Sequence, residues 1–217
     1  MRHMLILSLI AGLALSTTSC VSLLPEPAAP PTIYRLNSDS APVQKLNAAK
    51  VLRVDTPIVP ASLRGPDIAL SPDGRVIAYA DGAKWDAPVP GLIQRAIIEG
   101  FDGSAALRAV SSKTGAESDY LLSVTVRSYE AVFINGKKTA PEARVVFDVS
   151  IVKAGGRQLV GNRLFRTDAM ASEFRIERIV IAQENATNQA VSEIVRWAEE
   201  RISAQPIQVS QAQYRTE

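Results

Sequence analysis

The chain has 217 residues, and its 24 Lys and Arg side chains nearly balance 22 Asp and Glu side chains, which leaves a formal charge of +2. A charge so close to zero, with no run of Lys or Arg, excludes the strongly basic surfaces typical of nucleic-acid binding and of polybasic membrane patches. The only histidine is His3, and the only cysteine is Cys20.

The first nineteen residues have the pattern of an export signal. Arg2 is followed by apolar and small residues from 4 to 15, and then by the small polar residues 16–19. An apolar run of about a dozen residues is about 18 Å long as a helix, too short to cross a hydrocarbon core about 30 Å thick. We expect residues 1–19 to be a signal peptide.

The sequence around Cys20 resembles the acylation site of a bacterial lipoprotein. Thr18 and Ser19 suit that pattern, whereas Leu is usual at the position of Thr17, and here Leu15 lies two residues earlier. The resemblance implies cleavage before Cys20 and the attachment of acyl chains, palmitate among them, which together hold a protein durably on a membrane. The alternatives are an ordinary secretory signal with an unmodified cysteine, or cleavage elsewhere in the small-residue stretch.

Cleavage before Cys20 limits the chemistry of the remaining chain. Removal of 19 of the 217 residues would leave 198, enough for one domain with tails. Without His3 and with Cys20 acylated, the mature chain has no imidazole and no free thiol. Thiol proteases, Ser-His-Asp hydrolases and zinc enzymes with His or Cys ligands are thereby excluded, and only carboxylate catalysis remains open. We expect no metal and no cofactor.

Residues 20–31 form the predicted tether. Its prolines at 25, 27, 30 and 31 favour an extended conformation, and eleven residues at about 3.1 Å each reach about 34 Å. The folded part would therefore stay close to its membrane. Val21 rather than Asp follows the cysteine, which favours the periplasmic side of the outer membrane over the inner membrane.

Residues 32–203 have the pattern of strands and helices expected of a single domain. Strands are predicted in its first half at residues 32–36, 50–54, 68–70 and 75–80. Ser71-Pro72-Asp73-Gly74 suits a type I turn between the last two strands. Residues 81–88 lead into a helix, with Asp86 as the expected N-cap and Pro88 in the first turn. Its predicted buried stripe is Leu92, Ile93, Ala96, Ile97 and Phe101.

The second half predicts an antiparallel meander and a closing helix. Further strands are expected at residues 106–110, 120–134, 143–152 and 158–166. Tyr120, Leu122 and Val124 would face one side and Ser123, Thr125 and Arg127 the other, with an Asn135-Gly136 turn after them. A helix with an apolar face that includes Ile179, Ala186 and Trp197 is expected over 174–202, before a flexible polar tail at 204–217. The fold class is therefore α/β, with a mixed, largely antiparallel sheet and helices packed on it.

The order of these segments resembles the ABC-type transport auxiliary lipoproteins, the group that includes the paraquat-inducible protein C-like lipoproteins. The resemblance covers about residues 34–202 and rests on Tyr34-Arg35-Leu36, Val51-Leu52-Arg53-Val54 before Pro57 and Pro60, the hairpin to Tyr79, Trp85-Asp86-Ala87-Pro88 and Asp119-Tyr120-Leu121-Leu122. The chain departs from the family at Ser62-Leu63-Arg64-Gly65, where Tyr-Leu-Asp-Arg is common.

The resemblance implies a fold and a set of partners. The fold would be an anticodon-binding-like α/β sandwich. The protein would be a non-catalytic lipoprotein of a lipid transport system in the periplasm. Its neighbours would be an Mce-type substrate-binding protein, an ABC permease and an ATPase. Whether the chain forms a homo-oligomer stays open.

Trp85, Asp86 and Pro88 are the candidate partner or lipid contacts outside Cys20. The commoner interpretation of Trp85 is a core residue at a helix start, and Tyr79 and Tyr129 are ordinary sheet residues on the same reasoning. Two alternatives to a docking role remain. The chain could carry a lipid or small ligand in an apolar cavity of its own, or could hydrolyse a substrate with carboxylates such as Asp86 and Glu177.

Overall fold

A computed structural model describes residues 29–38, 50–134, 136, 139–155 and 158–205. The chain divides into two compact units, Met1–Pro30 and Pro31–Glu217, and every helix and strand named below belongs to the second. The predicted signal peptide, Cys20, most of the tether and residues 206–217 of the predicted tail lie outside the described residues. Within the described ranges no helix is long and apolar enough to cross a membrane.

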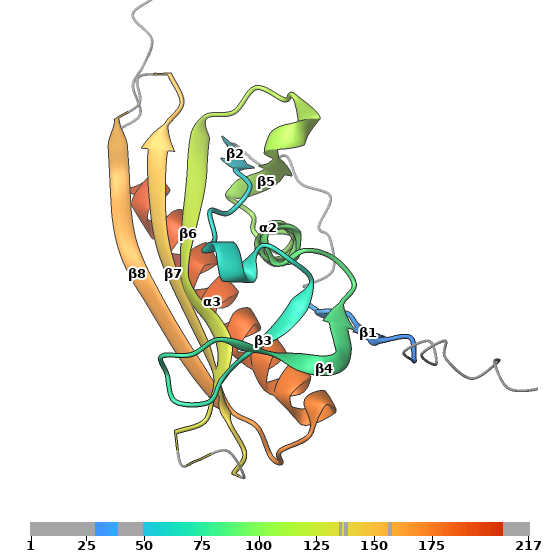
Figure 1. The fold of residues 1–217 in the computed structure, drawn as a ribbon. Helices are drawn as coiled ribbons and strands as arrows, with labels where there is room; N and C mark the ends of the chain where they lie inside the picture. Colours follow the sequence, from blue (N-terminus) through green and yellow to red (C-terminus); the bar gives the residue numbers. More distant parts are fainter. Residues whose placement is uncertain (1–28, 39–49, 135, 137–138, 156–157, 206–217) are drawn as a thin grey trace, which may run out of the picture. The chain divides into compact units, whose positions relative to one another are not determined.

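The second unit has a single mixed sheet (Figure 1). The strands are β1 Thr32–Tyr34, β2 Lys50–Val54, β3 Asp67–Ser71, β4 Ala78–Trp85, β5 Leu107–Ser111, β6 Tyr120–Val132, β7 Glu142–Lys153 and β8 Leu159–Met170. The helices are α2 Val89–Gly100 and α3 Ile176–Ser203, with short 3-10 turns η1 Ala61–Leu63 and η2 Ser112–Thr114. The predicted fold class, with helices packed on a largely antiparallel sheet, is confirmed.

Strand β6 is the centre of the sheet. One of its edges pairs along its whole length with β7, which in turn pairs with β8, so the predicted antiparallel meander is confirmed. The other edge is shared by three segments: β2 pairs in parallel beside Tyr120, Ile58 forms a bridge to Thr125, and β3 pairs in parallel beside Val132. The remaining parallel pairs join β2 to β5 and β1 to β4.

The alternation of β6 changes phase halfway along the strand. Tyr120, Leu122 and Val124 are buried as predicted, but the pairing with β7 shifts register between Val126 and Ser128. An extra residue in one strand reverses which positions face inward. Tyr129 is therefore buried, although simple alternation from Tyr120 would place it on the outer face.

Both helices pack on the same face of the sheet. The inward stripe of α3 contacts β7 and β8, and α2 contacts α3, β2 and β5. The close approach of the two helices depends on Gly100, where a Cβ atom would lie 2.2 Å from Cγ1 of Val191. The stripes predicted from helical spacing are buried, including Leu92 and Ile97 on α2 and Ala186 on α3.

The predicted entry to α2 was partly wrong. The β3–β4 hairpin exists, but β4 begins at Ala78 and continues to Trp85, because its last three residues pair with β1. The N-cap of α2 is Pro88, and Asp86 makes no capping bond. A side-chain cap is not needed for the first donor, since the Val89 N–H donates to the carbonyl of Gly65 at 3.2 Å.

Candidate docking surfaces

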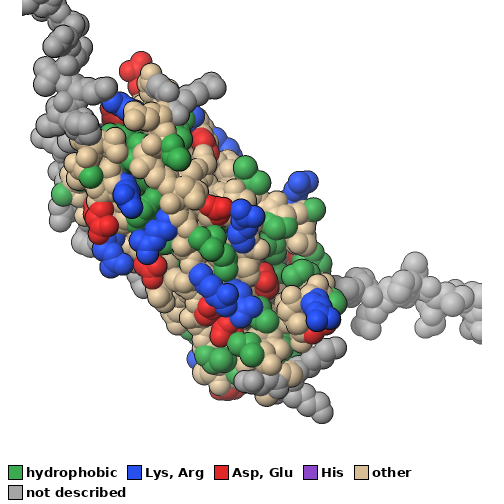
Figure 2. Space-filling model, turned by 90° about the vertical axis from the view of Figure 1, so that its left-hand side faces the viewer, with side chains coloured by type: hydrophobic (Ala, Val, Ile, Leu, Met, Phe, Trp, Pro, Cys, Tyr) green, Lys and Arg blue, Asp and Glu red, His purple; other side chains and the backbone are tan. Residues whose placement is uncertain are grey.

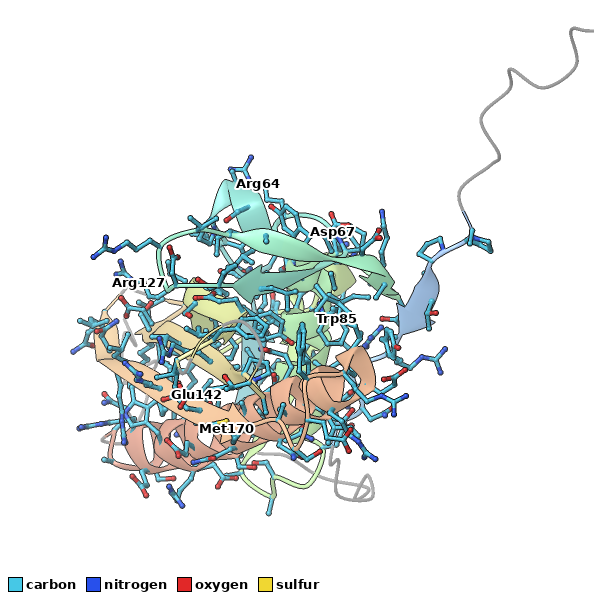
Figure 3. The ribbon with its side chains drawn as sticks, turned by 60° about the horizontal axis from the view of Figure 1, so that its bottom comes forward. Arg64, Asp67, Trp85, Arg127, Glu142 and Met170 are labelled. Atoms are coloured by element: carbon cyan, nitrogen blue, oxygen red, sulfur yellow. The ribbon has the colours of Figure 1, made fainter. Side chains whose placement is uncertain are left out.

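The junction of β4 and α2 holds the three residues predicted from sequence, and they differ in accessibility. Trp85 is 3% exposed, its ring lies 6.4 Å from that of Tyr129, and its backbone N–H donates to the carbonyl of Pro66. Figure 3 shows Trp85 in the interior, whereas Arg64 projects from η1. Asp86 and Pro88 are exposed. A partner at this junction would therefore meet Asp86 and Pro88 rather than the indole ring, and their contact role stays a prediction.

Asp86 joins β1 to the start of α2. Its carboxylate lies 3.3 Å from Nε of Arg35 and 3.2 Å from a guanidinium nitrogen of Arg95, and its N–H donates to the carbonyl of Tyr34 at 2.7 Å. Pairs with such exposed arginines contribute about 0–1 kcal/mol to stability. Asp86 therefore has a structural role, because it connects the end of β1 to the first turns of α2.

The two carboxylates of the hydrolase alternative, Asp86 and Glu177, both pair with arginines. Glu177 lies 3.9 Å from Nε of Arg175. Partial burial, followed by the charge and hydrogen bond of Glu177, raises the pKa of the Tyr34 hydroxyl. Among the described residues, no group of three or more His, Cys, Asp or Glu side chains is placed to hold a metal ion.

A second surface lies on the outer face of the meander, opposite the helices. We name it the outer ladder: Arg127, Glu142, Arg144, Asp148, Asn162, Arg166 and Asp168. Asp148 accepts from Arg127 at 2.7 Å and from Asn162 at 2.9 Å. Asp168 accepts from Arg144 at 3.0 Å and from Arg166 at 2.9 Å. These bonds cross β6, β7 and β8 and hold charged groups in fixed positions.

Two aspartates of the outer ladder, Asp148 and Asp168, have lowered pKa values. Hydrogen bonds from Arg127 and then Asn162 lower the pKa of Asp148. Burial raises the pKa of Asp168, but hydrogen bonds from Arg166 and Arg144 outweigh that effect and lower it. Fixed charges of both signs are a feature of surfaces that select a partner by electrostatic complementarity.

Apolar side chains interrupt the charges on this face. Leu164 on β8 is 57% exposed and lies opposite Asp148, and the half-buried Val146 lies opposite Arg166. Figure 2, which views the molecule from the β8 side, shows acidic, basic and apolar side chains interspersed. This mixture of exposed apolar groups and ordered charges is typical of a protein–protein interface.

The sequence placed Arg127 on the outer face but did not identify the ladder. Two of its ion pairs cross between strands: Arg127 and Asp148 are 21 positions apart, and Arg144 and Asp168 are 24 positions apart. Finding them requires the exact register of three strands, and the bulge after Val126 alters that register. The charge pattern of each strand taken alone carries no such signal.

A small cavity lies between α2 and α3. Its volume is about 40 Å³, and it is lined by Ser38, Ala96, Gly100, Asn188, Val191 and Ser192. A water molecule occupies about 30 Å³ in the liquid, whereas ligand pockets measure about 300–1,000 Å³. This cavity is too small for an acyl chain and does not support the carrier alternative.

The comparison with known protein families decides the assignment. The family described as ABC-type transport auxiliary lipoprotein component matches residues 34–195. The chain belongs to this family. Membership supports an auxiliary, non-enzymatic role beside an ABC transporter and a membrane-anchored location outside the cytoplasm.

Two solved structures share the fold of this auxiliary lipoprotein. One is a DUF330 protein from Xanthomonas campestris, with 21% identity and a TM-score of 0.71 over 79% of this chain and 97% of that one. The other is a protein described as uncharacterized, with 16% identity and a TM-score of 0.63 over 78% of this chain and 99% of that one. At these identities the likeness concerns the fold. No curated protein matches the sequence.

Proposed function

We propose that this auxiliary lipoprotein is a non-catalytic subunit of an Mce-type ABC lipid transport system, and that it works by docking in the periplasm. Acyl chains on Cys20 would hold it on the outer membrane, and the tether would keep the domain near that surface. The family match over residues 34–195 carries the proposal. The outer ladder supplies a suitable docking face, because it presents fixed charges and an exposed Leu164 side by side.

The partners are an Mce-type substrate-binding protein and the permease and ATPase of the same system. A tagged full-length protein, captured from detergent-solubilised membranes, should recover these components, and mass spectrometry would identify them. Recovery of no ABC transport component would contradict the proposal.

The docking face is tested by charge reversal. Arg127→Glu combined with Arg166→Glu should reduce recovery of the partner at least about tenfold, as expected when like charges face each other in an interface. Arg64→Glu, directly after η1, is the matched control, since Arg64 is exposed and lies outside the outer ladder. Equal recovery with both variants would place the docking face elsewhere.

A further inference from the structure

Five large apolar side chains are exposed at one end of the sheet. We name this set the apolar end: Val76, Ile77, Ile134, Met170 and Phe174. Each is between 36% and 58% exposed. They come from the β3–β4 hairpin, the β6–β7 hairpin, and the last residue of β8 with the segment that leads to α3, which meet at the lower end of Figure 1.

Pairing across the sheet brings these connections together. Ser71 at the end of β3 pairs with Val132, and the Phe133 N–H donates to the Ser71 carbonyl at 3.0 Å. Glu142 lies between Val132 and Met170 in the register of β6, β7 and β8, and Figure 3 shows Glu142 and Met170 side by side.

An aromatic contact fixes the third connection. The Phe174 ring lies 5.3 Å from the ring of Phe133 in an edge-on arrangement, so the residues after β8 sit beside the β6–β7 hairpin. Ile134, the neighbour of Phe133, points into solvent together with Phe174. The exposed set is therefore a cluster built by tertiary contacts.

The opposite end of the sheet has a different character. It holds η2, the segment from η2 to β6 and the connection between β7 and β8, and their described residues include the exposed Lys113, Glu117 and Gln158. Leu159 is the one large apolar side chain exposed there among the described residues. Scattered exposed apolar residues are ordinary, but a cluster confined to one end indicates a contact surface.

The attachment of the tether identifies what this surface meets. Thr32 pairs with Ala83, five residues along β4 from Ala78 beside the hairpin, a distance of about 17 Å for a strand. A Pro-rich segment of the length between Cys20 and β1 would span about 34 Å if extended, enough for a lipid anchor on Cys20 and the apolar end to share one membrane. Glu177, three residues after Phe174, lies close enough to Tyr34 to influence its hydroxyl.

We infer that the apolar end dips into the lipid surface to which the chain is anchored. The five exposed side chains of the apolar end would insert at the headgroup boundary, as exposed aliphatic and aromatic groups do in peripheral proteins. Arg75, Arg175 and Arg178 are exposed nearby and can meet lipid phosphates, while Asp73 and Glu173 offset part of their charge. Apolar insertion therefore supplies most of the contact. This inference rests on the proposed lipid anchor at Cys20.

The test measures depth in the bilayer at one position. Phe174→Trp in the full-length protein would be reconstituted into phosphatidylethanolamine and phosphatidylglycerol vesicles that contain brominated phosphatidylcholine, which quenches nearby indoles. Trp85 and Trp197 are both buried and provide a low background. Leu164→Trp, exposed on the outer ladder face, is the matched control. We expect about twofold more quenching at position 174 than at position 164.

The outcomes separate this inference from the proposed anchor. Equal quenching at the two positions overturns the membrane contact. The contact is also overturned if the emission of the indole at position 174 shifts only when a partner protein is added and does not shift with lipid alone. Intact mass measured on the same sample reports acylation of Cys20 independently. An unacylated protein that still shows the quenching refutes the anchor and keeps the membrane contact. If Phe174→Trp fails to fold, Ile134→Trp takes its place in the same comparison.

Discussion

At the scale of single residues, Gly100 is the position where a methyl group has the clearest cost. A Cβ atom there would lie 2.2 Å from Val191 Cγ1, so Gly100→Ala must separate α2 from α3. We expect a loss of about 1–3 kcal/mol in the free energy of unfolding, measured by urea denaturation. Gly91→Ala on the same helix is the control, since no atom lies within 4 Å of its added Cβ. It should be neutral or stabilising, and adding Val191→Ala to Gly100→Ala should recover most of the loss.

Tyr129 makes a second residue-scale prediction, about alkaline pH. Burial raises the pKa of Tyr129 from 10.0 to about 12. In the unfolded chain the hydroxyl loses its proton near 10, whereas the folded state keeps it, so the stabilising contribution falls as pH rises through this window. The slope is about 1.4 kcal/mol per pH unit. Tyr129→Phe should remove this slope. Urea titrations of both proteins at pH 9 and above measure the difference, and parallel curves would contradict it.

At the scale of elements, the outer ladder joins β7 to β8. Asp168 has a lowered pKa, so its contribution is present above the unfolded value of 3.8 and is lost as pH falls through the folded value. Asp168→Asn should cost about 1 kcal/mol at pH 7, a modest figure because the pairs are partly exposed. The variant and the parent protein should converge in stability near pH 2. A constant difference across that range would show that the loss has a packing origin.

The elements themselves were largely predictable from local patterns. Alternation gave β2 and the meander, and helical spacing gave the buried stripes of α2 and α3. The prediction of Asp86 as the N-cap was wrong. The Val89 N–H, which a capping side chain would accept from, donates to the Gly65 carbonyl instead. The strand β4 ran longer than expected because β1 pairs with its end, and that contact joins residues about fifty positions apart.

The candidate sites were less predictable than the elements. Trp85 carried the most specific sequence signal, and its side chain lies in the core. The outer ladder and the apolar end depend on register and on contacts such as Phe133 with Phe174. Such surfaces are assembled from segments that look ordinary one at a time.

At the scale of the whole molecule, anchoring is the central expectation. Cys20→Ala should shift the protein from the membrane pellet to the soluble periplasmic fraction, because the acyl chains supply the durable attachment. Density-gradient separation of the membranes of the parent strain should place the protein with outer-membrane markers. A Cys20→Ala protein that pellets with the membranes and keeps its function would refute the anchor.

The sharing of one edge of β6 by three segments has a consequence for how the chain acquires its structure. Strands β6, β7 and β8 with α3 are consecutive in sequence and joined by short connections, so they can assemble early. Strands β2 and β3 can pair only after β6 has formed, and their pairing with β6 closes loops of roughly sixty residues, so we expect it to be later. If the chain is exported with its N-terminus first, the part nearest the proposed anchor at Cys20 would emerge first and pair with the sheet last. Pulse-labelling hydrogen exchange during refolding should therefore protect the amides of β7 before those of β2.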